Sequence, residues 1–449
     1  MMDDEKIGFI ERFGYGLGDF ACNLVWASMG SFIMFYYTDV VGIGAAVIGT
    51  LMMAVRLLDG VLDISVGLLV DRTHSKDGKA RPWIKWMAVP FGLSMIALFS
   101  VPKIAESQQL MYISLTYVIV NVFYTAVNVP YGVLNSLITQ DQYQRSVVNI
   151  FRNLLSTVGT VLVTVLTLPL VKAFGGQQTG WRKMAIVFGV AATALLLITF
   201  FTTKERVKPF AENADKNVPL GVGLKALVKN KYWLMIVAFM IITFISLLEA
   251  GGVTMYYQSY ILHDASFVGK KSLFTAIPSI LILMFVAAPM VKRLGKRKTA
   301  MIGCAINAVG CALMFINLRD VTVILGASVV KGLGSALVGA VMFALLADTI
   351  EYGEWKNGVR TEGLIYSAGS FGTKVGSGIG TAMVGWILAI GHYQNGVAVQ
   401  SASAINAMIV LFAVIPLILI IIDFIILYFF KLDNIYPQIV ADLKERAAQ

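Results

Sequence analysis

Three ionisable side chains, Arg56, Asp59 and Asp63, lie within a long apolar segment of the sequence. Their spacing of i, i+3 and i+7 places all three on one face of a helix. Two carboxylates held close together repel each other, so that one binds a proton more tightly or both share a cation. Ionisable groups at bilayer depth are costly and usually mark a polar pathway. The segment therefore predicts a cation site on a membrane helix, with Arg56 as part of its charge network.

The composition indicates a polytopic membrane protein. The chain has 449 residues, of which 57% are hydrophobic and 14% are charged, whereas an ordinary soluble chain is about 25% charged. The net charge of +10 does not indicate a nucleic-acid partner, because the basic residues cluster between apolar segments as in cytoplasmic loops. Cys22, Cys304 and Cys311 lack CxxC spacing, so neither a metal site nor a disulfide framework is expected, and no cofactor is expected.

Twelve apolar segments are near or above the ~20 residues that a membrane helix needs. Basic residues gather in 71–82, in 292–298 and in the long connection 204–231, which places both termini in the cytoplasm of a multi-pass protein of the cell (inner) membrane. The segments are approximately 11–38, 43–70, 83–102, 109–138, 147–173, 183–203, 232–261, 271–291, 299–317, 321–350, 362–390 and 402–430.

The repeated loop pattern predicts two halves of six helices each. We expect an all-α major facilitator fold with an N-terminal bundle at 1–203, a cytoplasmic linker at 204–231, a C-terminal bundle at 232–431 and a cytoplasmic tail at 432–449. The loop Gly67-Leu-Leu-Val-Asp-Arg72 followed by Gly78-Lys-Ala-Arg81 resembles the loop signature of that superfamily.

Depth along the helices brings more polar residues to the level of Asp59. Counting ~1.5 Å per residue from the expected cytoplasmic ends places Asp19, Asn128 and Lys374 near the same depth. A substrate and ion site at the interface of two repeats predicts this convergence. The alternative is structural, with Arg56 and Lys374 only neutralising the two aspartates. Nearby candidates for substrate binding are Tyr124, one turn deeper, and Arg152, which is shallower.

Several other polar residues have two open interpretations. Trp26 either stacks on a sugar ring or packs in the helix bundle. Glu249 either binds substrate or pairs locally, and Asp423 is expected to pair with a nearby base. The remaining charges lie near the expected cytoplasmic surface and are predicted to form a gating network: Asp71, Arg72, Asp348 and Glu351.

These residues also resemble a known family, the glycoside–pentoside–hexuronide:cation symporters, over nearly the whole chain. The matching stretches are Gly14-Tyr-Gly-Leu-Gly-Asp19, Tyr36-Tyr-Thr-Asp-Val-Val-Gly42, Arg56-Leu-Leu-Asp-Gly-Val-Leu-Asp63, Gly78-Lys-Ala-Arg-Pro-Trp83, Tyr124-Thr, Asn128-Val-Pro-Tyr131, Ala347-Asp-Thr-Ile-Glu-Tyr-Gly-Glu354, Arg360-Thr-Glu-Gly-Leu-Ile-Tyr-Ser367 and Lys374.

The resemblance implies a role for each matched residue. Asp59 and Asp63 would carry the coupling cation with help from Thr125. The residues matching the family's sugar contacts are Asp19 and Asn128, and those flanking its site are Arg152 and Lys374.

Two departures affect which substrate and ion the resemblance implies. The melibiose carriers of the family have Asp where this chain has Asn128, and Asn where it has Leu62, a position that helps to select Na⁺. The chain is more similar to the glucuronide and xyloside carriers. We therefore favour H⁺ over Na⁺, since protonation does not need the missing oxygen ligand.

The sequence thus predicts a sugar porter that couples a glycoside or glycuronide to a monovalent cation by alternating access, working as a monomer in the bilayer. The alternative is an efflux carrier or a non-accumulating membrane sugar sensor of the same fold. An enzyme is not expected, because no nucleophile–base pair or metal-ligand cluster stands out.

Overall fold

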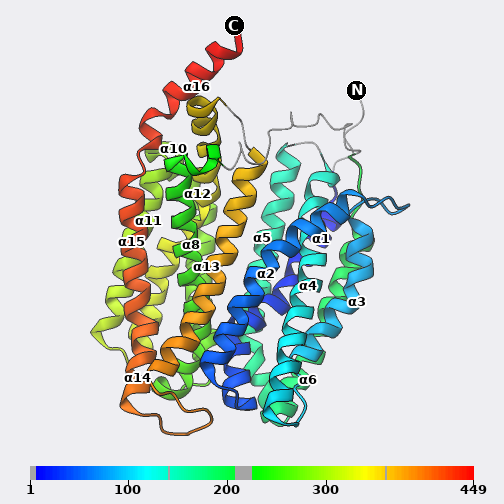
Figure 1. Ribbon diagram of the computed structural model, residues 1–449, viewed down its shortest axis with the longest axis vertical. Coiled ribbons are helices and arrows are strands. Elements are labelled where there is room, and N and C mark those ends of the chain that lie inside the picture. The colour runs from blue at the N-terminus through cyan, green and yellow to red at the C-terminus, as the bar shows by residue number, and fades with distance from the viewer. Residues whose placement is uncertain (1–6, 140–141, 208–224, 359–361, 449) are drawn as a thin grey trace. The chain divides into compact units, whose positions relative to one another are not determined.

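The computed structural model describes residues 7–139, 142–207, 225–358 and 362–448, and in these ranges the chain is helical with no strand (Figure 1). Each of the twelve expected apolar segments forms helix, and ten helices are long and apolar enough to cross a membrane. The helices of the other two segments, α1 (Phe9–Ser28) and α3 (Arg81–Leu98), are more polar because of residues such as Asp19 and Lys85. The prediction of an all-α polytopic protein is confirmed.

The chain divides into two compact units, Met1–Glu212 with His392–Gln400, and Asn213–Gly391 with Ser401–Gln449. The boundary lies inside the predicted linker 204–231, of which 208–224 is outside the described residues. Each unit is described by itself below.

Six long helices make up the N-terminal unit. The end of α1 continues through two π-helical segments, Met29–Ile33 and Tyr36–Val41, and stops at Gly42, whose φ of +100° favours glycine. The helices that follow are α2 (Ala45–Asp71), α3, α4 (Glu106–Ile138), α5 (Gln142–Ala173) and α6 (Gln177–Thr202).

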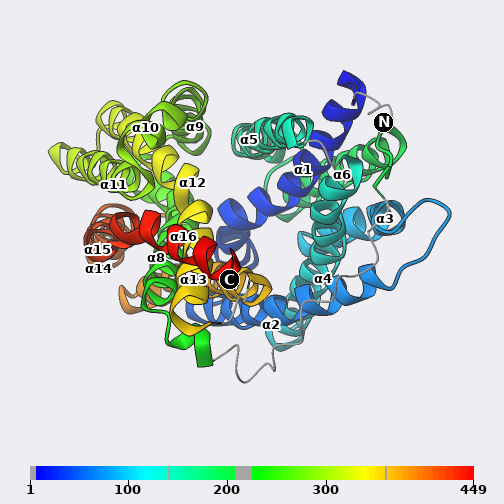
Figure 2. The ribbon, with the colours of Figure 1, turned by 90° about the horizontal axis from the view of Figure 1, so that it is seen from above.

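Small residues let these helices approach closely. Helix α1 packs against both α5 and α6, α3 packs against α4 and α6, and α2 packs against α4 (Figure 2). A Cβ atom on Gly16 of α1 would lie 2.8 Å from the carbonyl oxygen of Phe151 in α5, so only glycine fits at this crossing. As a result, the polar faces of α1 and α5 meet, as do those of α2 and α4.

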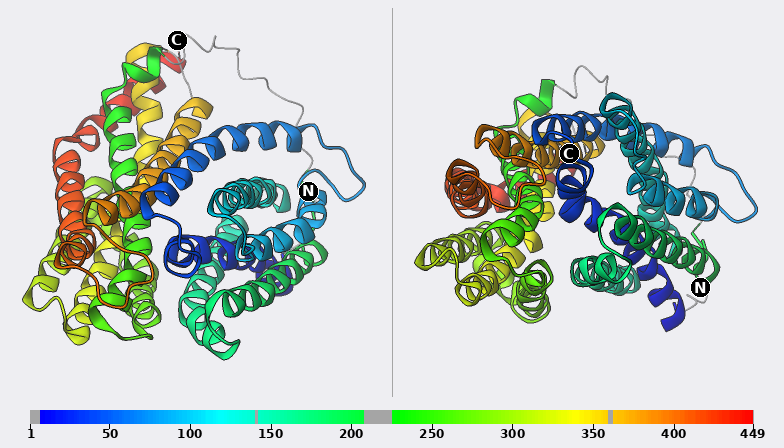
Figure 3. Two further views of the ribbon diagram at one scale, coloured as in Figure 1. Left: turned by 60° about the horizontal axis from the view of Figure 1, so that its bottom comes forward. Right: turned by 90° about the horizontal axis from the view of Figure 1, so that it is seen from below.

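The C-terminal unit is also a helix bundle, seen from two further directions in Figure 3. Helix α8 packs against α13 and α15, while α12 packs against α9 and α11. A π-helical segment, Val410–Val414, joins α14 to α15. The helices are α8 (Lys231–Tyr257), α9 (Phe267–Phe285), α10 (Ala287–Leu294), α11 (Lys296–Leu313), α12 (Val321–Asn357), α13 (Glu362–Ile390), α14 (Ala402–Ile409), α15 (Ile415–Phe429) and α16 (Leu432–Ala448).

Two acidic residues fasten the start of the linker to the N-terminal unit. The Glu205 carboxylate accepts hydrogen bonds of 2.8 Å from the backbone N–H groups of Lys79, Ala80 and Arg81, at the N-terminus of α3. The Glu11 carboxylate of α1 accepts hydrogen bonds of 2.7 and 2.8 Å from the guanidinium of Arg206. Glu205 places a negative charge at the N-terminus of α3, and Glu11 pairs with the positive charge of Arg206. Both contacts hold the start of the linker against the N-terminal unit.

The crossing of α13 and α8 provides a test of packing. A Cβ on Gly376 would lie 2.4 Å from the carbonyl oxygen of Ile241, whereas a Cβ on Gly339 of α12 meets nothing within 4 Å. We expect Gly376→Ala to lower the free energy of unfolding by about 1–3 kcal/mol, because the added methyl group overpacks the crossing. Thermal unfolding in detergent measures this effect. The matched control Gly339→Ala should leave Tm unchanged or raise it, since alanine is the better helix former, and equal effects of the two variants would contradict the packing argument.

Candidate functional site

Asp59 and Asp63 of α2 share one hydrogen-bond donor. The hydroxyl of Thr125 in α4 lies 2.7 Å from Oδ1 of Asp59 and 3.3 Å from Oδ1 of Asp63. Asp59 is buried at 3% exposure, and Asp63 is half-buried. One hydroxyl carries one proton, so it can donate fully to only one carboxylate at a time. The structure thus brings together the three residues predicted for the cation, as a cluster of oxygen atoms inside the unit.

Arg56 is on the same face of α2 but has other partners than the predicted aspartates. It is 2% exposed, its Nη1 donates to Oδ1 of Asn121 at 3.2 Å, and its guanidinium carbon lies 4.1 Å from the ring centroid of Trp26. The Trp26 ring also stacks on Tyr124, with 5.1 Å between ring centroids. Trp26 therefore makes a cation–π contact and an aromatic contact within the protein.

Sequence reasoning missed Asn121, although a signal for it was present. Asn121, Thr125 and Asn128 follow each other at i, i+4 and i+7 on α4, so they share one helix face. The Asn121 amide donates to the carbonyl oxygen of Tyr117 at 2.7 Å, which orients its oxygen toward Arg56. Asn128 is half-buried, and within the described residues its amide makes no hydrogen bond, so its donors and its acceptor are open to a ligand.

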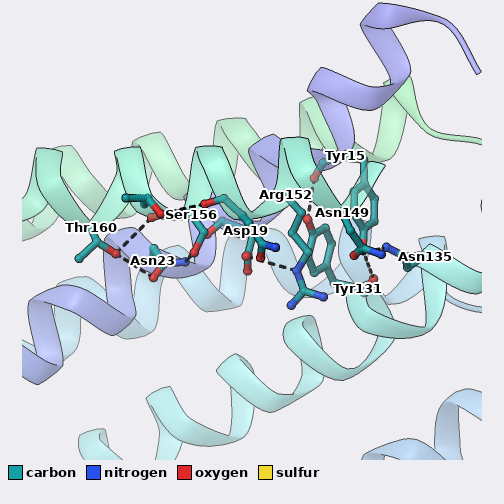
Figure 4. Close-up of polar contacts among 11 residues, drawn as sticks. Tyr15, Asp19, Asn23, Tyr131, Asn135, Asn149, Arg152, Ser156 and Thr160 are labelled. Atoms are coloured by element: carbon teal, nitrogen blue, oxygen red, sulfur yellow. Dashed lines mark hydrogen bonds and ion pairs between the residues drawn. The ribbon is translucent and has the colours of Figure 1, made fainter. Parts of the chain in front are cut away.

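Asp19 of α1 pairs with Arg152 of α5 (Figure 4). The Nε of Arg152 donates to Oδ2 of Asp19 at 3.3 Å, and the guanidinium carbon lies 5.2 Å from the ring centroid of Tyr131. Tyr131 in turn stacks on Tyr15 at 4.5 Å, and each of the two hydroxyls donates to the backbone carbonyl of the other residue. Among the described residues, Arg152 has a hydrogen-bond partner only at Nε, so its other donors can bind a hydroxyl-rich or anionic ligand.

A polar ladder that was not predicted from the sequence continues from Asp19 along α1 and α5. The Asn23 amide donates to the backbone carbonyl of Asp19 and to the hydroxyl of Ser156, both at 2.8 Å, and accepts from Thr160 at 3.1 Å (Figure 4). The i+4 spacing of Asn23 from Asp19 was the available signal. The ladder fixes the rotation of α1 against α5 and hence the direction of Asp19.

In the C-terminal unit, Lys374 lies on α13. Gly372, Gly376 and Gly380 of that helix are the positions in close contact with α8, and Lys374 is about 200° around the helix from Gly372 and from Gly376. It is half-buried and faces away from α8. Glu249 of α8 is fully buried in the same unit.

The predicted basic partner of Asp423 is wrong. Its Oδ2 accepts a hydrogen bond from the hydroxyl of Thr243 at 2.9 Å, and its buried Oδ1 has no hydrogen-bond partner among the described residues. Thr243 and Asp423 lie on α8 and α15, which pack together. A hydroxyl satisfies a carboxyl group inside the bundle without introducing a second charge.

The residues predicted for gating belong to both units, Asp71 and Arg72 to the first and Asp348 and Glu351 to the second. Asp348 of α12 accepts hydrogen bonds of 2.5 and 2.7 Å from the Nζ of Lys296, which belongs to the basic segment 292–298. Glu351 is half-buried one turn further along α12, and Arg72 is exposed. The side chain of Asp71 lies outside the described part of the chain.

A family model described as "MFS/sugar transport protein" matches residues 14–434. The chain belongs to this family.

Relatives of this sugar transport protein extend over its full length. It is 35% identical to the isoprimeverose transporter of Lactiplantibacillus pentosus, over 98% of this chain and 92% of the relative. It is 32% identical to the inner membrane symporter YicJ of Escherichia coli (strain K12), over 93% and 90% of the two chains. The structure of a mutant nucleoside transporter NupG has a TM-score of 0.66 at 14% identity, covering 93% of this chain and 99% of that one, which supports the major facilitator fold.

The Lys296–Asp348 pair of this sugar transport protein allows a stability test. Asp348 is 6% exposed, so we expect Lys296→Met to leave its carboxylate unpaired and to cost about 1–3 kcal/mol. Adding Asp348→Asn should recover most of that loss. A double-mutant cycle on thermal unfolding in detergent measures the coupling between the two residues, and a coupling energy of zero would show that the pair does not stabilise this end of the bundle.

Proposed function

We propose that this sugar transport protein is a secondary active symporter that moves a glycoside or glycuronide together with a monovalent cation by alternating access. Its membership of a sugar transport family supports this proposal, as do relatives named as an isoprimeverose transporter and a symporter. The observation that carries the proposal is the Thr125 hydroxyl shared between Asp59 and Asp63. Two carboxylates that face one hydroxyl repel each other, and a bound proton or other cation relieves that repulsion.

The cation completes this cluster. A proton on one carboxyl group supplies a second donor and removes the repulsion between Asp59 and Asp63. Na⁺ would need more oxygen ligands than the two carboxylates and Thr125 provide, and the neighbouring Leu62 has an apolar side chain. We therefore propose H⁺ as the coupling ion and keep Na⁺ as the second candidate.

The sugar binds beside the cation in this proposal. Asp19, Arg152 and Asn128 offer both acceptors and donors for hydroxyl groups, and Tyr124 and Trp26 border them with aromatic surface. Lys374 is proposed as a sugar contact from the C-terminal unit, whereas Glu249, at 0% exposure, is left out of the sugar site.

Coupling requires that the cation and the sugar stabilise the same state. Reciprocal coupling between two bound ligands is typically ~1–3 kcal/mol, which corresponds to a 5- to 150-fold change in affinity. Arg56 and Lys374 are the fixed positive charges that we propose to balance the acidic pair when the cation is absent. The carrier moves its substrate without chemical change.

The remaining features follow from the family's mode of action. We propose that the halves 1–203 and 232–431 move as two bundles around the site, with the linker 204–231, the tail 432–449 and both termini in the cytoplasm. Asp71, Arg72, Asp348 and Glu351 would gate the cytoplasmic end. The protein would work as a monomer in the cell (inner) membrane.

Uptake into membrane vesicles tests the coupling role of the acidic pair. We expect Asp59→Asn and Asp63→Asn to abolish accumulation of the glycoside against its gradient, because the amide cannot bind a proton or neutralise Na⁺. The matched control is Asp77→Asn, at an exposed loop aspartate that pairs with Lys85 at 3.8 Å. If either membrane variant still concentrates sugar as the wild type does, the assignment of the cation to these residues is wrong.

A thermal-shift experiment with a panel of glycosides identifies the substrate and the ion. A bound glycoside at about 100 times its Kd should add ~2.7 kcal/mol to the unfolding free energy. We expect this gain to depend on pH, to be equal in Na⁺ and K⁺ buffers, and to decrease in Asp19→Asn. A gain that appears only with Na⁺ would replace the proton by sodium as the coupling ion.

A further inference from the structure

Glu249 of α8 has no hydrogen-bond partner although it is completely buried. Its side chain is 0% exposed, and neither carboxylate oxygen has a donor in the described part of the chain. The positive charges that act on it come from two other helices, Lys331 of α12 and Lys271 of α9. A buried carboxylate without donors costs several kcal/mol, so its presence in the bundle needs an explanation.

Lys271 is turned into the bundle by its surroundings. Its Nζ donates to the hydroxyl of Thr254 in α8 at 2.6 Å and lies 5.0 Å from the ring centroid of Phe412. The side chain of the preceding residue, Lys270, points away from the bundle. Its Nζ pairs with Asp264 in the loop at 3.0 Å, and the side chain is 47% exposed. Of two adjacent lysines, one therefore neutralises a loop aspartate and the other reaches Thr254 on α8, the helix that carries Glu249.

Lys331 is held where α9, α11 and α12 meet. A Cβ on Gly310 of α11 would lie 2.7 Å from its Cγ, so the lysine stem occupies the space that this glycine leaves. The next residue, Gly332, accepts a hydrogen bond of 2.9 Å at its carbonyl oxygen from Ser279 of α9. These contacts fix the backbone and the first part of the Lys331 stem at this crossing.

Other charged groups on the helices around α8 are directed elsewhere. Lys374 lies on the side of α13 away from α8, and Asp423 of α15 is bound by Thr243, six residues before Glu249. Among the described residues, the charges that act on Glu249 are thus those of Lys271 and Lys331, which gives a set of one carboxyl group and two amines in apolar helices. With every group ionised the set carries one excess positive charge, and the carboxylate still lacks a direct hydrogen bond.

We propose that the Glu249–Lys271–Lys331 cluster is a second proton-binding site, located in the C-terminal unit and separate from the Asp59–Asp63 pair. A structural ion pair would place an ammonium against the carboxylate, whereas the contact of Lys271 goes to Thr254. The incomplete pairing leaves Glu249 able to gain and lose a proton as the surroundings change. The inference does not rest on sugar transport, since the site needs no substrate.

Infrared difference spectroscopy of the purified protein in lipid nanodiscs, stepped between acidic and alkaline buffer, tests this proposal. The C=O stretching band of a protonated carboxyl group reports each buried acid directly. We expect Glu249→Gln to remove one band that Asp59→Asn and Asp63→Asn retain. The control Glu106→Gln, at an exposed position, should leave the buried-acid bands unchanged.

The lysine variants test the cluster even if Glu249→Gln does not fold. Lys331→Met and Lys271→Met each remove a positive charge that stabilises the ionised carboxylate, so the band should persist to a pH higher by about one unit or more, a tenfold change in proton affinity. The proposal is overturned if Glu249→Gln retains every band of the wild type, or if neither lysine variant moves the titration. Because no sugar is present, failure here is distinguishable from failure of the proposed symport.

Discussion

The contact on which the rest of the N-terminal unit depends is the hydroxyl of Thr125 between Asp59 and Asp63. Two acidic side chains one turn apart on a membrane helix are unfavourable unless something is placed between them. Helix α4 supplies that hydroxyl, and its neighbouring positions on the same face, Asn121 and Asn128, supply the contact with Arg56 and a free amide. The packing of α2 on α4 is thus determined by polar side chains as well as by apolar ones.

The polar contacts between α1 and α5 differ in their charges from the Asp59–Asp63 cluster. The Asp19–Arg152 pair, with Asn23 next to it, joins opposite charges inside the unit, whereas Asp59 and Asp63 place two like charges at one hydroxyl. This difference suits the two proposed roles. A paired carboxylate and guanidinium offer acceptors and donors to sugar hydroxyls, while two neighbouring carboxylates favour a cation.

Much of the fold followed from the sequence, because long apolar segments with basic connections leave few alternatives to membrane helices. The grouping of Asp59 with Asp63 also followed, since the i, i+4 spacing is a property of any helix. The contacts of Arg56 and Trp26 with each other did not, because they depend on the rotation of α1, α2 and α4 about their axes. Asp423 was assigned a basic partner on general grounds, and a hydroxyl from the adjacent helix satisfies it instead.

The central claim is that the cation on Asp59 and Asp63 and the glycoside stabilise one common state. The most direct measurement is the Kd of the glycoside for the purified protein as a function of pH and of Na⁺, in the wild type and in Asp59→Asn. The account predicts that the wild-type affinity changes by 5- to 150-fold with the coupling ion and that the variant loses this dependence. A glycoside affinity that is independent of both ions in the wild type, or equally dependent in the variant, would contradict it.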